Sequence, residues 1–336
     1  MTAVLDGEFA DYWSAIVASD DHRAADVALA AVGRGVSVEA ALMGLVVASQ
    51  VRVGELWEAN EWSVPREHAS SAVNEHVVRR LCQDVIGDPA GPLLLVACAE
   101  REWHALPALV ITQLLALHGA RAEYLGPNTS RDHIVAGILD RGPRAVLLSA
   151  SMSSSLPRVR RQIEAVRGTG TPVIVGGAAF DRAGQRARWL GATGCATTAS
   201  EALELVERLP RHVPPAPTLR HPGAAEARDV QIAAETLTRS VTRVVDSALG
   251  LTDGGEAAGS PDDWRVVLAT SIPMVVDCVA GGLLTDDASI LTESRDWLRS
   301  VMDSRDAPAE TTSLVWTALA RQLRDHPEAT RLIALT

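Results

Sequence analysis

The stretch that decides the fold is Leu93-Leu94-Leu95-Val96-Ala97-Cys98, an unbroken apolar run that opens into a polar loop. A short apolar run that ends in loop residues is typical of a strand buried on both faces of a sheet. Strands that alternate with helices predict a doubly wound parallel sheet of the Rossmann or flavodoxin-like class, with ligands at the carboxyl ends of its strands. The other expected strands are Arg121–Leu125, Ala145–Ser149 and Val173–Val175, and the helical stretches lie near 107–118, 130–140, 157–167 and 181–189.

Two helical blocks flank this α/β block, so the chain is expected to be multidomain. Residues 1–88 carry Ala and Leu at helical spacing and end in a Gly- and Pro-rich stretch, which predicts a helical bundle. The α/β domain then covers residues 89–209, and a proline-rich, polar linker covers 210–223. Residues 224–336 have a helical pattern again and predict an all-helical domain.

The composition excludes some classes of function. A net charge of −11 argues against direct binding of nucleic acid, which needs a basic surface, and the pairs Arg79-Arg80 and Arg160-Arg161 are expected on solvated helix faces. The four cysteines lie far apart without a Cys-x-x-Cys spacing and are expected to be buried apolar residues in a reducing compartment. No secretion signal is recognised and no apolar run reaches membrane-spanning length, so we expect a cytoplasmic protein.

Distinctive residues follow three of the predicted strands. The triplet Glu102-Trp103-His104 follows the first strand and is followed in turn by Pro107. Ser149-Ala150-Ser151 ends the third strand, and Gly176-Gly177 ends the fourth. In type and spacing this series resembles the cobalamin-binding pattern Asp-x-His-x-x-Gly, Ser-x-Leu and Gly-Gly. Glu102, Pro107 and Ser151 depart from that pattern.

The resemblance implies how this chain would hold a cofactor. His104 would be the lower ligand of the cobalt, replacing the cofactor's own base, and Glu102 would bind the other ring nitrogen and fix the tautomer. Trp103, which stands between them in the same loop, is also a candidate cofactor-binding residue. Ser149, Ser151, Gly176 and Gly177 would line the slot that takes the displaced nucleotide tail, where a glycine leaves the slot open.

The N-terminal helical block carries a second pattern. Trp57 is expected near the end of one helix, and Glu67-His68 in the first turn of the next. This spacing is similar to the cap motif of adenosylcobalamin-dependent light sensors. The resemblance implies that Trp57 packs against the upper adenosyl group and that Glu67 contacts this group. It also implies that His68 becomes the upper cobalt ligand after light breaks the Co–C bond.

The order of cap, cobalamin domain and helical domain resembles the photocobilins, which hold biliverdin in the last domain. Arginines would pair with the propionates, an acidic residue would accept pyrrole N–H bonds, and tryptophans would sandwich the ring. One alternative is a dimerisation bundle, in which Trp297 and Trp316 pack between helices and Cys278 is a core thiol. The candidate biliverdin residues are Trp264, Arg265, Asp277, Trp297 and Trp316, with Met274, Cys278 and Arg299 nearby.

These patterns predict a light sensor rather than an enzyme. Photolysis of the Co–C bond would change the conformation or the assembly of a homo-oligomer, with biliverdin as a second chromophore. The alternative is a corrinoid carrier that serves a methyltransferase or mutase partner. The cap motif favours the sensor, and we find no barrel-sized partner domain or general-base constellation for a self-sufficient enzyme.

Overall fold

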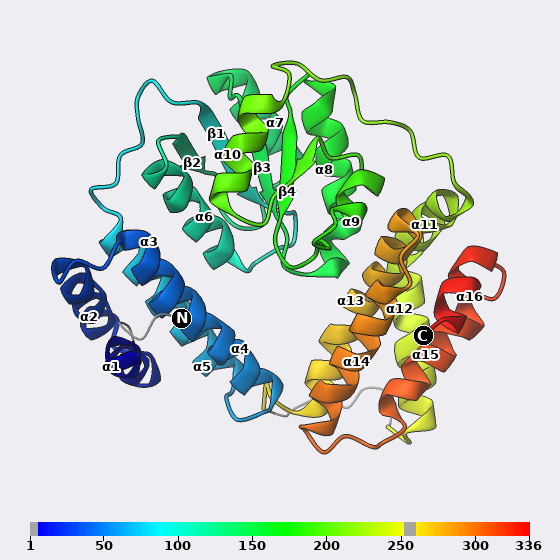
Figure 1. The fold of residues 1–336 in the computed structure, drawn as a ribbon. Coiled ribbons are helices and arrows are strands. Elements are labelled where there is room, and N and C mark those ends of the chain that lie inside the picture. The colour runs from blue at the N-terminus through cyan, green and yellow to red at the C-terminus, as the bar shows by residue number, and fades with distance from the viewer. Residues whose placement is uncertain (1–5, 252–259) are drawn as a thin grey trace.

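The computed structural model describes residues 6–251 and 260–336. Within these residues, a helical cap and a C-terminal helical domain lie on either side of an α/β domain, and the cap and the C-terminal domain meet at their far ends (Figure 1). The predicted fold class, with a helical bundle, a doubly wound parallel sheet and a second helical domain, is confirmed.

The cap is built from two helical hairpins. Ser37 begins its long helix by accepting a hydrogen bond from the Ala40 N–H (3.1 Å), and a π-helical segment interrupts that helix. Inside the cap the Tyr12 hydroxyl donates to the buried Asn74 amide oxygen (2.7 Å). The helices are α1 (Asp6–Val17), α2 (Asp21–Gly33), α3 (Val38–Ala41), the π segment η1 (Leu42–Val47), α4 (Ala48–Glu58) and α5 (Val64–Leu81).

The α/β domain has a five-stranded parallel sheet in the order β2-β1-β3-β4-β5. The four predicted strands are present, whereas β5 escaped prediction because two residues carry no readable pattern. The strands are β1 (Leu93–Cys98), β2 (Arg121–Tyr124), β3 (Ala145–Ser149), β4 (Val173–Gly176) and β5 (Gly194–Cys195), and the helical segments are α6 (Ala105–Leu117), α7 (Arg131–Arg141), η2 (Ser153–Ser155), α8 (Leu156–Gly168), α9 (Gln185–Trp189) and α10 (Ala199–Arg208).

The sheet separates two hydrophobic cores because its side chains alternate between faces. On one face Leu94 and Val96 pack in a core shared with α6, α10 and the cap. On the other face Leu95 and Ala97 pack in a core shared with α7, α8 and the C-terminal domain. Each helical domain is therefore an extension of one side of the sheet.

The C-terminal domain is built around α13. This helix contains Pro273 and is long and apolar enough to cross a membrane, which corrects the expectation that no such run exists. However, 67% of its most apolar window is buried, so its composition is that of a core helix and does not indicate a membrane protein. The helices are α11 (Pro222–Ile232), α12 (Ala234–Ala248), α13 (Trp264–Thr285), α14 (Ser289–Asp303), α15 (Thr311–Gln322) and α16 (Pro327–Ala334).

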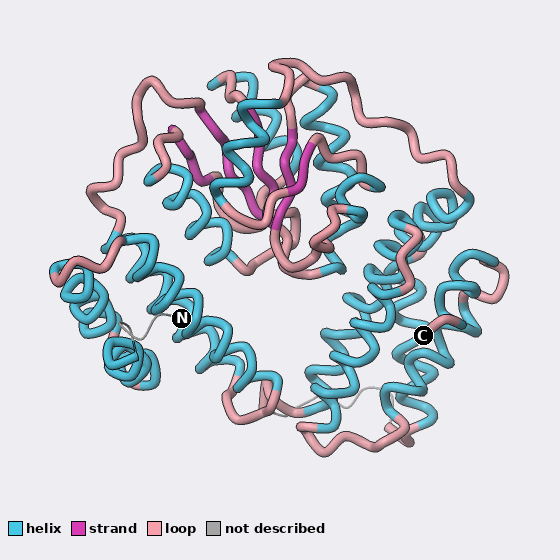
Figure 2. The backbone as a smooth tube through the Cα atoms, in the orientation of Figure 1, coloured by secondary structure: helices cyan, strands magenta, loops and turns pink. Residues whose placement is uncertain are grey.

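The linker between α10 and α11 runs along the outside of the α/β domain (Figure 2). Arg160 donates to the Pro217 carbonyl (2.7 Å), and Arg167 donates to the Pro214 carbonyl (2.9 Å). The expectation that Arg160 lies on a solvated helix face is wrong. Its side chain is only 6% exposed, because the linker covers it and supplies an acceptor.

Candidate cofactor site at the carboxyl edge of the sheet

The loop after β1 carries the central candidate residues. It leaves the sheet through a hydrogen bond from the Ala99 N–H to the Ser149 carbonyl (2.9 Å) and ends at His104, the N-cap residue of α6. Arg101 has a positive φ of 65°, and its N–H donates to the Asn128 side chain (2.8 Å). The loop is therefore held in one shape by its neighbours at the edge where ligands bind in such sheets.

Glu102 and His104 form a close pair within this loop. His104 Nδ1 lies 2.5 Å from Glu102 Oε1, which also accepts the His104 backbone N–H (3.0 Å). The other carboxylate oxygen accepts the backbone N–H groups of Ser151 (2.8 Å) and Met152 (3.1 Å). Since Glu102 is 1% exposed and fully bonded, its position is fixed, and it fixes the imidazole in turn.

The two members of the pair shift each other's pKa. The hydrogen bond that His104 donates to the Glu102 carboxylate raises the pKa of His104 above 6.5, burial opposes that rise, and the charges of Glu102 and Glu67 add to it. Burial raises the pKa of Glu102, but its bonds to His104 and to the Ser151 N–H outweigh burial, so that pKa is lowered. The carboxylate is thus ionised near neutral pH, and it accepts a hydrogen bond from His104 Nδ1–H.

The second ring nitrogen of His104 is available to a ligand. The His104 side chain is 57% exposed, and Nε2 has no hydrogen-bond partner among the described residues. With Nδ1–H held by Glu102, the Nε2 lone pair points away from the pair and can bind a metal. Trp103, beside it, is 68% exposed.

A cavity of about 160 Å³ lies at the same edge of the sheet, and Pro107, in the first turn of α6 after His104, is one of the residues that line it. Ser149, Gly176 and Gly177 line it, as the sequence predicted for a tail slot, whereas Ser151 contributes its backbone N–H to Glu102 instead. The sequence did not single out the residues of α6 and α10 that close the cavity, because they read as ordinary helix core. These include Ile111 and Ala202; Thr198, the N-cap of α10, and Pro107, which the sequence had marked as a departure from the pattern, line the cavity as well.

The backbone around Gly176 and Gly177 leaves no room for a side chain at either position. A Cβ on Gly176 would lie 2.6 Å from the Ala196 carbonyl oxygen, and one on Gly177 would lie 2.4 Å from that of Ala150. Gly177 also has a φ of +104°, which L side chains rarely adopt. An open slot is therefore not the only requirement for glycine here, since close approach of the chain already demands it.

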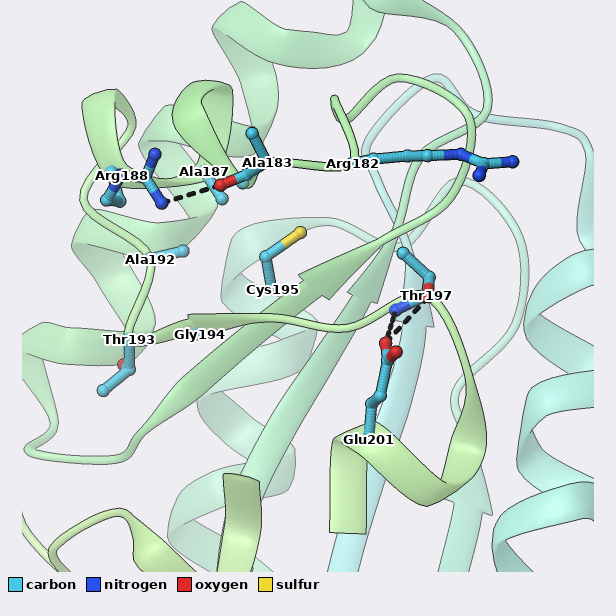
Figure 3. Close-up of a pocket in the computed structure, with 11 residues that line it drawn as sticks. Arg182, Ala183, Ala187, Arg188, Ala192, Thr193, Gly194, Cys195, Thr197 and Glu201 are labelled. Carbon is cyan, nitrogen blue, oxygen red and sulfur yellow. Dashed lines mark hydrogen bonds between the residues drawn. The ribbon is translucent and has the colours of Figure 1, made fainter. Parts of the chain in front are cut away.

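A second, wider cavity of about 630 Å³ opens on the outer side of β5 (Figure 3). Arg182, Arg188 and Cys195 line it, and Glu201 accepts hydrogen bonds from the Thr197 N–H (2.8 Å) and hydroxyl (2.7 Å) at its rim. Burial raises the pKa of the Cys195 thiol. Thr197 lines both cavities, so they are neighbours across β5.

The cap candidates occupy the corner between α4 and α5. Glu67 Oε1 accepts the Ser71 hydroxyl (2.8 Å), and His68 Nδ1 lies 2.8 Å from the Val64 carbonyl and 2.9 Å from Glu67 Oε2. The His68 side chain is 73% exposed. Trp57 stacks on Trp297 of α14, with centroids 6.4 Å apart. The corner thus meets the C-terminal domain, and the charge of Glu67 acts on His104.

The biliverdin candidates do not line one cavity among those described. Asp277 binds Arg158 of α8 (2.9 Å), and burial raises its pKa. Trp316 is 5% exposed in the domain core, and its buried Nε1 has no hydrogen-bond partner. Arg265 lies over the Trp264 ring, 4.8 Å from its centroid. Trp297 faces the cap, and Cys278 is a buried thiol whose pKa is raised to about 12 by burial.

Two family models match the chain, each described as a B12 binding domain, over residues 92–207 and residues 8–81. The cap and the α/β domain are thus each similar to a B12 binding domain. In fold the chain is similar to the monomethylamine corrinoid protein of Methanosarcina barkeri, with a TM-score of 0.52 and 21% identity over 61% of this chain and 100% of that chain. None of the curated proteins matches the chain.

Two further solved structures are similar at lower TM-scores. The methanol:cobalamin methyltransferase complex of Methanosarcina barkeri matches at 0.32 and 16% identity, over 60% of this chain and 79% of that chain. A cobalamin-binding protein from Desulfitobacterium hafniense matches at 0.32 and 19% identity, over 59% of this chain and 96% of that chain.

The residues at the carboxyl edge of the sheet fit cobalamin. A corrin ring supplies the equatorial nitrogens of its cobalt, so a single imidazole is enough for the protein's share. Among the described residues no group of three or more His, Cys, Asp and Glu side chains is arranged to hold a bare metal ion. His104 offers a free Nε2, and the cavity beside it offers an apolar slot.

Proposed function

We propose that this chain binds cobalamin in the form in which the cofactor's own base is displaced from the cobalt, and that His104 takes its place as the lower axial ligand. The observation that carries the proposal is the 2.5 Å contact between Glu102 Oε1 and His104 Nδ1, which leaves Nε2 free. When bound, cobalamin supplies a light-sensitive or transferable Co–C bond. The cavity lined by Ser149 and Gly177 would take the nucleotide tail.

Absorption spectroscopy of the reconstituted protein tests this proposal. Wild type should give the spectrum of cobalamin with a protein imidazole in place of its own base. His104→Ala should bind weakly or give the spectrum of a base-on or water-ligated form. The exposed His133 on α7 supplies a control, and His133→Ala should match wild type. An unchanged spectrum in His104→Ala would refute the assignment.

For the use of the cofactor, we propose a light sensor with resident adenosylcobalamin. What supports it is the cap corner, which carries Trp57 and His68 and is bound to the C-terminal domain by Arg305 and by the Trp57–Trp297 stack. A carrier must expose the upper face of its corrin to a partner enzyme, whereas a sensor can keep it covered. Light would act by changing the conformation or assembly of the chain, and a change in assembly would appear in measurements of the oligomeric mass in light and dark.

A corrinoid carrier for a methyltransferase or mutase is the second candidate. The comparisons favour it over the sensor, because the cap and the α/β domain match the fold of a corrinoid protein over its full length. The two functions separate under green light. In both cases photolysis of adenosylcobalamin should change the spectrum, but only a sensor should also change its oligomeric state, whereas a carrier should keep it.

Biliverdin remains a candidate second chromophore of the C-terminal domain. What supports it is the position of Trp297 on the side that meets the cap, and the Arg265–Trp264 pair at the start of α13. Adding biliverdin to the full chain should then produce a new long-wavelength band. A missing band would remove biliverdin from the proposal, would favour a dimerisation bundle, and would leave the cobalamin assignment intact.

A further inference from the structure

The corner between α4 and α5 presents two helix ends to the C-terminal domain. Trp57 and Glu58 are the last residues of α4, and Val64 is the first residue of α5. Backbone carbonyls at a helix C-terminus and N–H groups at a helix N-terminus lack partners within their own helix. In this corner, both kinds of group are bonded by residues of the C-terminal domain.

Arg305, just after α14, caps the end of α4. Its guanidinium donates to the carbonyls of Trp57 (3.0 Å) and Glu58 (3.3 Å). Its Cζ lies 5.0 Å from the centroid of the Trp57 ring. A cation at a helix C-terminus also interacts favourably with the helix dipole. Arg305 is 6% exposed, so these contacts are shielded from water.

Neighbouring groups complete the contact. The Ser304 hydroxyl donates to the Glu58 carbonyl (2.8 Å), and the Asn60 amide donates to the Ser304 carbonyl (3.2 Å). No ion pair to Arg305 is found among the described residues. Its guanidinium donates to carbonyls and a hydroxyl, and the charges of Asp262 and Glu58 act on it without direct contact. A flat guanidinium can bind two adjacent carbonyls at once, which a lysine ammonium does less well.

Asp262 caps the start of α5 by accepting a hydrogen bond from a backbone N–H group. The Val64 N–H donates to Asp262 Oδ1 (2.8 Å), whereas Ser63, the residue in the N-cap position, makes no side-chain capping bond. A carboxylate at a helix N-terminus has the favourable sign for the dipole. The two adjoining helix ends of the cap are therefore capped from another domain. Each capping residue has the charge opposite to the partial charge of the helix end that it binds.

We propose that Arg305 and Asp262 are positioning residues that hold the corner 57–68 by capping α4 and α5 in trans. They fix Trp57 and His68 on the side of the sheet that carries His104, and they make the C-terminal domain the element that sets the upper face of the site. The effect on cobalamin rests on the proposed function, whereas the capping itself does not.

Amide hydrogen exchange of the cofactor-free full chain tests the capping. Arg305→Ala should speed exchange of the Asn60, Glu61 and Trp62 amides by about tenfold, and Asp262→Asn should speed mainly that of Val64. Amides of β1 should be unchanged. Arg299→Ala, on the exposed face of α14, is the matched control. Equal corner exchange in wild type, Arg299→Ala and Arg305→Ala overturns the proposal.

A milder variant and a second measurement guard against simple unfolding. Arg305→Lys keeps the charge but not the paired bonds, and it should fall between wild type and Arg305→Ala. In the protein loaded with hydroxocobalamin, Arg305→Ala should speed the replacement of the upper ligand by added cyanide. Unchanged replacement with faster corner exchange would refute the role toward the cofactor. If wild type fails to bind cobalamin, the proposed function falls while the exchange data still decide the capping.

Discussion

The carboxylate of Glu102 joins His104 to a strand that is distant in sequence. One oxygen lies 2.5 Å from His104 Nδ1, and the other accepts the N–H groups of Ser151 and Met152 beyond β3. The imidazole is thus oriented by the end of β3 as well as by its own loop. A displacement of that strand end would be transmitted to His104 through a single carboxylate.

Replacement of Glu102 tests this relationship. In Glu102→Gln the imidazole loses its charged partner, and cobalamin affinity should fall by about 10- to 100-fold, the usual effect of losing a group that orients a metal ligand. Ser151→Ala is the matched control, because Ser151 contacts Glu102 only through its backbone N–H. Binding titrations followed by absorption measure both, and equal affinities in the two variants would contradict the role of Glu102.

The pH dependence of binding follows from the raised pKa of His104. Cobalt needs the lone pair of Nε2, and a proton competes for it. Affinity should therefore fall as pH decreases through the pKa of His104, at a value above 6.5, and approach a loss of about tenfold per pH unit below it. In Glu102→Gln the midpoint should move to lower pH. Titrations at a series of pH values would show a pH-independent affinity if another group bound the metal.

Filling the 160 Å³ cavity should exclude the nucleotide tail. Ala202 of α10 lines the cavity and is buried, so Ala202→Leu adds volume there. The nucleotide tail would then have to enter a space that the leucine fills. Because such overpacking costs about 1–3 kcal/mol, cobalamin affinity should fall about tenfold or more. A corrinoid without the tail should bind as it does to wild type. Ser200→Leu, exposed on the same helix, is the control, and parallel losses for both corrinoids would show that the tail lies elsewhere.

Light tests the role of the cap. After illumination of the adenosylcobalamin-loaded chain, wild type should develop the stable spectrum of cobalt with two imidazole ligands, and His68→Ala should not. The physical reason is that His68 is 73% exposed, with Nδ1 held at the Val64 carbonyl. His133→Ala serves as the control. Identical light products in wild type and His68→Ala would refute this use of His68.

The sequence predicted those features that depend on residues close to one another in the chain. Four strands and the Glu102–His104 pair follow from local apolar runs and from two residues close in the chain. The cap end of the site depends on contacts between residues about 200 or more positions apart, such as Trp57–Trp297 and Val64–Asp262, for which the sequence carries no local signal. Arg160 looked like a surface residue because two of its acceptors, the carbonyls of Leu190 and Pro217, are distant from it in the chain.

The glycines show a different limit of sequence-based prediction. Gly176 and Gly177 were interpreted as space for a ligand, and they do line the cavity. The chain would require them without any ligand, because a Cβ at either position collides with a neighbouring carbonyl. A motif can therefore be correctly located while one physical reason for it stays hidden until the backbone is known.

The linker bound along α8 has a consequence for cutting the protein into parts. Arg160 and Arg167 give hydrogen bonds to the carbonyls of Pro217 and Pro214, so a chain that stops at Pro210 would leave two guanidiniums with unmet bonds in a partly dry pocket. Such a fragment would be weakened for reasons unrelated to the missing helices. A chain that stops after Leu219 keeps both acceptors. The structural border of the α/β domain thus lies beyond its last helix, inside a segment without secondary structure.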